Sequence, residues 1–238
     1  MKKTKIVCTM GPNTNDREMM RKLIQNGMNV ARFNFSHGDH EEQKFRMDML
    51  KELREEEHTN TAILLDTKGP EIRTGILKDG KKITLKEGET FTLTTEDIVG
   101  DNKRVSITYK GLAEDVSEGK IILIDDGLIE LEVKAIKGTD IVCDILNGGE
   151  LGEKKGVNVP NVKIKLPALT EKDKEDIRFG IKQGFDFIAA SFVRNAACIE
   201  EIRDILNIHG SRMRIIAKIE SAEGIENIDE ILQAADGI

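Results

Sequence analysis

Short apolar segments alternate with helical patterns at both ends of the chain, and this alternation limits the folds that it can adopt. Residues 6–10, 30–35 and 62–66 are rich in apolar and β-branched side chains, as buried parallel strands are. Apolar residues recur every three or four positions at 19–24 and 45–53, which predicts helices between these strands. The pattern returns near the end, with strands predicted at 185–192 and 215–219 and helices at 199–206 and 225–232.

Signals at the helix ends support this interpretation. Thr170 and Asp173 have the spacing of a capping box, so a helix is expected to begin there. Gly27 and Gly184 follow helical patterns directly, where glycine commonly ends a helix. On the helix predicted at 45–53, the spacing places four apolar residues on the buried face: Phe45, Met49, Leu50 and Leu53.

Alternating strands and helices with apolar, parallel-type strands predict an α/β fold. The architecture is either a (β/α)₈ barrel of the TIM type or an open, doubly wound sheet. Residues 235–238 are expected to open a further strand.

The middle of the chain follows a different pattern. Apolar and charged residues alternate over 129–135, as in a half-buried strand, and Gly-containing turn signals recur from Gly80 to Gly149. Because strand and helix units lie on both sides, we interpret this stretch as a small β-barrel domain inserted in one βα loop. The predicted division is 1–73 and 167–238 for the α/β domain and 74–166 for the insertion.

Composition narrows the class of protein. A chain of 238 residues with 39% apolar side chains can bury a core, and its net charge of −7 argues against a nucleic-acid or membrane binder. Cys8, Cys143 and Cys198 are too widely spaced for a disulfide framework, so buried thiols are expected. The first apolar run is too short for a signal peptide or a membrane span, which predicts a cytoplasmic protein.

Polar side chains gather where the predicted strands end. Arg32, Asn34 and Ser36 alternate along the end of the second strand and therefore share one face. The third strand closes with Asp66 and Thr67, and the strand at 215–219 closes with Lys218 and Glu220, which are two residues apart. Any one of these is most simply a salt bridge or a cap, but cations and carboxylates from three strand ends together predict an anionic, metal-assisted substrate site.

Four segments carry a resemblance to a known family. They read NVARFNFSHG at 29–38, LLDTKGPEIRT at 64–74, KKGVN at 154–158 and AKIE at 217–220. In this order and spacing they resemble pyruvate kinases, and the resemblance extends from about Lys3 to the last residue. It implies a partial TIM barrel with an inserted β domain that acts as a mobile lid, and the transfer of a phosphoryl group from phosphoenolpyruvate to ADP in glycolysis.

The resemblance also implies roles for individual residues. Arg32 would bind the substrate phosphate, and Lys218 would stabilise the transferring phosphoryl group. Glu220 would bind Mg²⁺ (or Mn²⁺). The residues implied for K⁺ are Asn34, Ser36, Asp66 and Thr67, and those implied for ADP or ATP are Asn34, Phe35, Ser36, His37, Arg73 and Lys155. For the whole protein the family implies a cytoplasmic homotetramer.

We expect the chain to be the N-terminal part of such an enzyme. In the family, a second magnesium-binding Asp follows the segment that ends here at Gly237, and a substrate-binding Thr comes later. The 238 residues alone are therefore expected to have little activity. Two alternatives remain: a truncated, non-catalytic paralogue that binds nucleotide or a partner, and a different barrel enzyme acting on phosphoenolpyruvate or an enolate.

His37 and His40 have a spacing that metal ligands on a helix can show. The chain has no HExxH sequence and no cysteine near them. They are interpreted as solvated or capping histidines.

Overall fold

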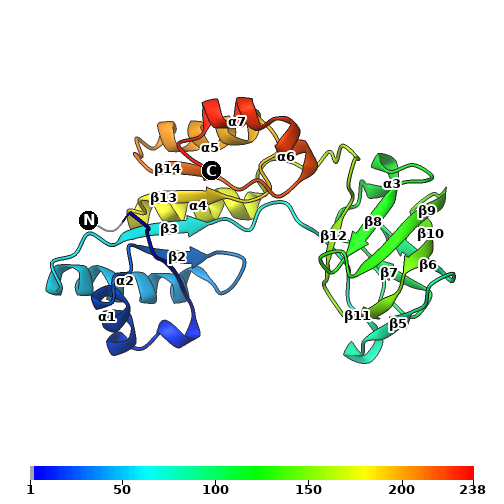
Figure 1. Cartoon of the computed structure of the whole chain (residues 1–238), viewed down its shortest axis with the longest axis horizontal. Helices are drawn as coiled ribbons and strands as arrows, with labels where there is room; N and C mark the ends of the chain where they lie inside the picture. Colours follow the sequence, from blue (N-terminus) through cyan, green and yellow to red (C-terminus); the bar gives the residue numbers. More distant parts are fainter. Residues whose placement is uncertain (1–2) are drawn as a thin grey trace. The chain divides into compact units, whose positions relative to one another are not determined.

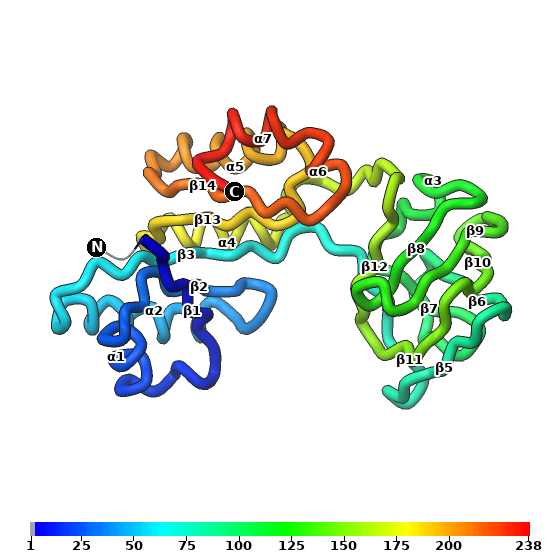
Figure 2. The backbone as a smooth tube through the Cα atoms, in the orientation of Figure 1, coloured from blue at the N-terminus to red at the C-terminus, as the bar shows by residue number. Residues whose placement is uncertain are grey.

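The computed structural model describes residues 3–238, and these form two compact units (Figure 1). The first unit comprises the chain up to Pro70 together with Ala168–Ile238, and the second comprises Glu71–Pro167. The backbone leaves the first unit once and returns to it once (Figure 2). The domain division predicted from the sequence, with an insertion at 74–166, remains a prediction. The compact units divide the chain a few residues away, with the second unit at Glu71–Pro167.

The first unit contains a five-stranded parallel sheet whose strands follow one another in chain order. They are β1 (Val7–Met10), β2 (Val30–Asn34), β3 (Ala62–Asp66), β13 (Phe187–Ala190) and β14 (Arg214–Ala217). A doubly wound sheet would reverse its order at a switch point, whereas this order continues in one direction. Gly237 pairs in parallel with Ile216 and extends the series beyond β14. The fold is a partial (β/α)₈ barrel with an inserted β domain.

Helices follow the strands of the first unit along the chain, and the last helix follows another helix directly. The helices are α1 (Arg17–Gln25), α2 (His40–Glu56), α4 (Glu171–Gln183), α5 (Ala196–Ile208), α6 (Ala222–Glu226) and α7 (Ile228–Ala234), and the 3₁₀ turn η1 spans Pro12–Thr14. Thr170 and Asp173 form the predicted capping box on α4, and Gly184 ends it with φ of +74°. Side-chain caps at Asp16, Asp39, Asn195 and Ser221 satisfy the free backbone N–H groups of four other helices.

The two faces of this sheet differ in chemistry. The face toward the helices is apolar and fully buried, with Ala31, Phe33, Ile63, Leu65, Ile188 and Ile215 as its members. Phe33 packs edge-to-face on Phe185 at 5.5 Å between ring centroids. Because side chains alternate along a strand, Arg32, Asn34 and Asp66 lie on the opposite face. The apolar face therefore fixes the position of the strands, and the other face is left for polar groups.

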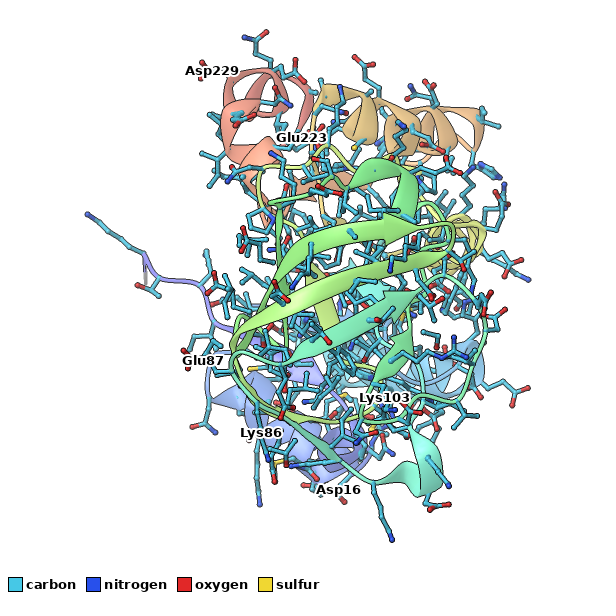
Figure 3. All side chains as sticks on the ribbon, turned by 90° about the vertical axis from the view of Figure 1, so that its right-hand side faces the viewer. Asp16, Lys86, Glu87, Lys103, Glu223 and Asp229 are labelled. Carbon is cyan, nitrogen blue, oxygen red and sulfur yellow. The ribbon has the colours of Figure 1, made fainter. Side chains whose placement is uncertain are left out.

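Four predictions about these elements were wrong in detail. Phe45 is 56% exposed, because the buried stripe of α2 runs through Arg46, Met47, Met49, Leu50 and Leu53. The helix predicted at 225–232 is two helices that meet at Asn227, and Figure 3 labels Glu223 on one and Asp229 on the other. Strand β13 covers only four of the eight residues predicted, since the chain turns at Ser191. Cys143 and Cys198 are buried, but Cys8 is partly exposed.

The second unit is a closed β structure. Its seven-stranded sheet runs β4 (Ile72–Arg73), β12 (Gly156–Asn158), β8 (Ile121–Ile124), β9 (Ile129–Lys137), β10 (Asp140–Asn147), β6 (Thr90–Thr94), β7 (Arg104–Ser106). A bridge between Thr74 and Ile107 joins the two ends of this order, so the sheet closes on itself. Strands β5 (Ile83–Leu85) and β11 (Gly149–Leu151) pair separately, and α3 (Leu112–Asp115) and the 3₁₀ turn η2 (Lys78–Gly80) lie in its loops.

Candidate functional site

A buried carboxylate between two cations is the centre of the candidate site in the first unit. Asp66, the last residue of β3, is only 2% exposed. Arg32 donates from Nε to Asp66 Oδ2 at 2.8 Å and from Nη2 to the same oxygen. Lys218 Nζ lies 2.9 Å from Oδ1, as an ion pair without the geometry of a directed hydrogen bond. The two cations share this one carboxylate, and each cation is about one-third exposed.

Parallel strand ends bring these three residues together. Asn34 and Asp66 are register partners on β2 and β3, and Arg32 is the partner of Thr9 and of Leu64. Thr9 Oγ1 accepts a hydrogen bond from Arg32 Nη1 at 2.8 Å. Lys218 follows β14 directly and donates its N–H to Ala190 O. The site therefore lies at the carboxyl ends of the strands, where barrels of this kind hold their polar residues.

The loop from β2 to α2 folds tightly around Asn34. Asn34 Oδ1 accepts the N–H of Ser36 at 2.9 Å, and Phe35 donates its N–H to Asp66 O at 3.0 Å. The Phe35 side chain is buried against Phe179 and Phe185, so only its backbone faces the loop. Of the four residues predicted for nucleotide in this loop, Asn34, Ser36 and His37 keep accessible side chains.

Gln43 was missed by the sequence interpretation, yet it organises this loop. Its side chain is 3% exposed and donates from Nε2 to Asn34 O at 3.1 Å and to His37 O at 3.0 Å. Arg46 is equally buried and donates to Asn15 Oδ1 at 2.6 Å. Gln43 and Arg46 are polar residues within the apolar stripe of α2. Polar residues at such positions usually have hydrogen-bond partners inside the protein, and this pattern could have revealed both from the sequence.

The residues predicted for K⁺ lie together. Asn34, Ser36, Asp66 and Thr67 come from two adjacent strand ends that are joined by register and by the Phe35 hydrogen bond. They supply amide, hydroxyl, carboxylate and carbonyl oxygens with a single negative charge. Such a set, mostly neutral and entirely oxygen, fits a monovalent cation.

Glu220, predicted to bind magnesium, lies beside Lys218. Its Oε1 is 3.6 Å from Lys218 Nζ, and its Oε2 accepts the N–H of Phe192 at 2.9 Å. Within residues 3–238, no group of three or more His, Cys, Asp or Glu side chains is arranged to hold a metal ion. The Glu220 side chain is about one-third exposed and has one oxygen free of backbone bonds, so it fits the role of a single carboxylate ligand.

The second unit carries its own pair of cations. Arg73 on β4 binds Glu71 through two hydrogen bonds, at 2.7 and 3.0 Å, and these raise the pKa of the Arg73 guanidinium. Lys155 Nζ lies 3.0 and 2.9 Å from the two oxygens of Asp125. The two cations are close in the fold because Arg73 pairs with Gly156, the residue after Lys155.

His40 was predicted to be a solvated or capping residue, but its ring makes specific contacts with α4. Its Nε2 lies 2.6 Å from Asp176 Oδ1, and its ring stacks on Phe179 at 4.3 Å between centroids. Asp176 is 1% exposed and also pairs with Lys172. The pair joins α2 to α4 behind the site and contributes to packing.

Comparison with known proteins gives the chain its family. A family model described as "Pyruvate kinase, barrel domain" matches residues 1–238. The chain belongs to the pyruvate kinase family. It is 51% identical to the pyruvate kinase of Clostridium perfringens over 240 residues, and 53% identical to those of Staphylococcus aureus and Geobacillus stearothermophilus. Each alignment covers 100% of this chain, but 50% of the first relative and 41% of the other two.

The chain thus spans about half the length, or less, of the pyruvate kinases it matches. The four segments that resemble this family all lie within the matched region, and they contribute the strand-end residues described above. In residues 3–238, no helix has the length and apolar character to cross a membrane.

Proposed function

We propose that the protein transfers a phosphoryl group from phosphoenolpyruvate to ADP, giving pyruvate and ATP. The observation that carries the proposal is the convergence of Arg32 and Lys218 on buried Asp66 at the strand ends, with Glu220 beside Lys218. Phosphoryl transfer needs little covalent work from the protein. Its rate comes from positioning and from neutralising the charge on the phosphoryl oxygens.

Arg32 and Lys218 perform that neutralisation in this proposal. Asp66 holds both side chains in fixed positions, so their remaining N–H donors are oriented before the substrate arrives. Arg32 keeps an exposed edge for the substrate phosphate, and Lys218 lies nearer Glu220 and the transferring group. Bound Mg²⁺ or Mn²⁺ at Glu220 and K⁺ at Asn34, Ser36, Asp66 and Thr67 would add positive charge at the same place.

The nucleotide would be bound through its phosphates by Arg73 and Lys155 of the second unit and by the 34–37 loop of the first. A guanidinium and an ammonium group on adjacent strands suit a diphosphate, because both donate charge-assisted hydrogen bonds. Nucleotide binding can be measured without turnover, so it tests this part of the proposal by itself.

A coupled assay of pyruvate formation tests the reaction. In the full-length protein, Lys218→Met is expected to lower kcat by about 100- to 1,000-fold, as removal of a donor to developing charge does. Lys22→Met, on the exposed side of α1, is the matched control and should retain the full rate. If the full-length protein forms no pyruvate from phosphoenolpyruvate and ADP, the proposal is wrong.

The 238-residue chain by itself is proposed to turn over slowly, because it supplies one of the two magnesium carboxylates that the family resemblance implies. Calorimetry of this chain with ADP, next to the coupled assay, separates the alternatives. Nucleotide binding without turnover in the full-length protein would favour a non-catalytic binding protein. A cytoplasmic homotetramer is proposed for the whole protein, and light scattering checks its mass.

A further inference from the structure

The turn at Ser191 and Phe192 contacts two of the strand ends that form the candidate site. It follows β13 and lies between the residues after β3 and those after β14. The resemblance assigns this turn no role. Its contacts nevertheless reach Thr67 on one side and Glu220 on the other.

Ser191 holds Thr67 through two hydrogen bonds. The Ser191 N–H donates to Thr67 Oγ1 at 3.0 Å, and the Ser191 hydroxyl donates to the Thr67 carbonyl oxygen. Thr67 Oγ1 donates to Ala189 O at 3.4 Å, so the Thr67 hydroxyl has its proton and one lone pair engaged within the protein. A carbonyl oxygen has two lone pairs, and the Ser191 hydroxyl uses one of those on Thr67. Thr67 can therefore offer a cation its carbonyl oxygen, in a direction that Ser191 sets.

Burial makes this arrangement rigid. Ser191 is 7% exposed and Thr67 is 2% exposed, so water does not compete freely for these bonds. Gly69 has φ of +71°, and a Cβ there would lie 2.8 Å from Ser191 Cβ and 2.9 Å from the Phe192 ring. The close approach that places Ser191 over Thr67 thus requires glycine at position 69.

The other end of the turn holds Glu220. Phe192 has φ of +55°, an uncommon conformation for a bulky residue, and its N–H donates to Glu220 Oε2 at 2.9 Å. This bond directs Glu220 Oε1 toward Lys218. Strain in the backbone at this point is consistent with a turn that positions functional groups.

We propose that Ser191 is a positioning residue for the monovalent-cation site, acting through the Thr67 carbonyl. The inference rests on the proposed function, because the cation site itself is part of that proposal. Ser191 does not touch the cation in this scheme. Its hydroxyl sets the orientation of one ligand, as residues behind metal ligands commonly do.

The test is a K⁺ titration of the full-length protein at constant ionic strength, with tetramethylammonium chloride as the replacement salt. Two signals are followed: the K⁺-induced rise in unfolding temperature and the binding of Tl⁺, a K⁺ substitute, by thallium NMR. For Ser191→Ala, the K⁺ concentration at half-effect is expected to rise about 10-fold, the lower end of the range for such residues. Ser191→Thr keeps the hydroxyl and should restore the wild-type curve.

Control variants separate positioning from simple stability. Ser211→Ala, in the loop before β14, should leave the K⁺ curve unchanged. A purely structural Ser191 would lower the unfolding temperature of Ser191→Ala by the same amount with and without K⁺, and that result would overturn the inference. If Ser191→Ala does not fold, Ser191→Cys has a weaker donor and should shift the curve about 3-fold. An unchanged curve in Ser191→Cys would then overturn it.

Failure of the proposed function gives a different result. A wild-type protein that shows no response to K⁺ or Tl⁺ would remove the cation site, and the role of Ser191 with it. A wild-type response with an unchanged Ser191→Ala curve would refute the role of Ser191 alone.

Discussion

The two units hold the cations of their candidate sites in different ways. In the first unit, Arg32 and Lys218 share the single carboxylate of Asp66, which is buried. In the second unit, Arg73 and Lys155 each have a carboxylate of their own, Glu71 and Asp125, and all four groups are partly exposed. The first arrangement is fixed by a shared, buried carboxylate, whereas each pair of the second is partly exposed and screened by solvent.

This difference indicates what each group of residues is built for. A site that stabilises charge in a transition state must have its donors oriented beforehand. A site that binds and releases a nucleotide needs cations whose protein partners are easily exchanged. The proposed division of labour, phosphoryl transfer in the first unit and nucleotide phosphates in the second, follows from the burial of the carboxylates.

The largest expected effect comes from removing the shared carboxylate. Asp66→Asn removes the carboxylate that pairs with Arg32 and leaves Lys218 with Glu220, so the free energy of unfolding should fall by about 3–5 kcal/mol. Urea denaturation measures it. Glu71→Gln is the matched variant in the second unit, and its loss should stay within about 1 kcal/mol. Equal losses would contradict the distinction between a buried and an exposed cluster.

Gln43→Leu tests how rigidly the first site is held. The substitution removes the amide group that donates to Asn34 O and His37 O, so His37 O loses this donor and Asn34 O is left with the 3.4 Å bond from the His37 N–H. The free energy of unfolding should fall by about 1–3 kcal/mol, and exchange of amide hydrogens in the 34–38 loop should speed up. Gln25→Leu, at the exposed end of α1, is the control. Unchanged exchange in the loop would show that Gln43 does not hold it.

Arg73→Met tests whether the second unit binds the nucleotide and not phosphoenolpyruvate. It should weaken ADP binding about 10-fold, close to 1.4 kcal/mol, and leave phosphoenolpyruvate binding unchanged. Calorimetry measures both ligands in the full-length protein. Lys154→Met is the control, since it is the neighbour of Lys155 but its own side chain is exposed. Equal weakening of both ligands would refute the separation of roles.

Much of this arrangement follows from local sequence. The capping box at Thr170 and the stop at Gly184 are properties of a few adjacent residues, and the structure has both. The proximity of Arg32 to Asp66 followed from the rule that parallel strand ends lie together. These predictions succeeded because short-range patterns and strand direction determine them.

Other features depend on contacts that the sequence does not display. The pairing of His40 with Asp176 requires α2 to pack on α4, across 136 residues of chain. The left-handed backbone conformation at Phe192 is not predictable locally, because the residue is neither glycine nor asparagine. Phe45 fits a helical stripe by spacing, but the packing of α2 selects the neighbouring stripe through Arg46 and Met47. The roles of Ser191 and Gln43 could be inferred only from the fold.

The smallest expected effect concerns Asp115, a buried carboxylate of the second unit that pairs with neither Arg73 nor Lys155. Asp115 has a side chain that is 1% exposed, and it accepts a hydrogen bond from the Tyr109 hydroxyl at 2.7 Å. Burial, aided by Asp115, raises the pKa of Tyr109 from 10.0 to about 12. The neutral phenol is thus favoured in the folded state, so its contribution to stability is complete below pH 10.0 and is lost as the pH rises toward 12.

Absorbance at 295 nm can follow this group directly, because Tyr109 is the one tyrosine in the sequence and there is no tryptophan. The titration midpoint should lie near 12 in the wild-type protein and move toward 10.0 in Asp115→Asn, which removes the charge but keeps the shape. Asp125→Asn is the control, since Asp125 pairs with Lys155 and not with Tyr109. A midpoint near 10.0 in the wild-type protein would mean that the Tyr109–Asp115 pair is open to water. In that case Asp66 of the first unit would be shielded from water and Asp115 of the second unit would not, which would make the contrast between the two units larger.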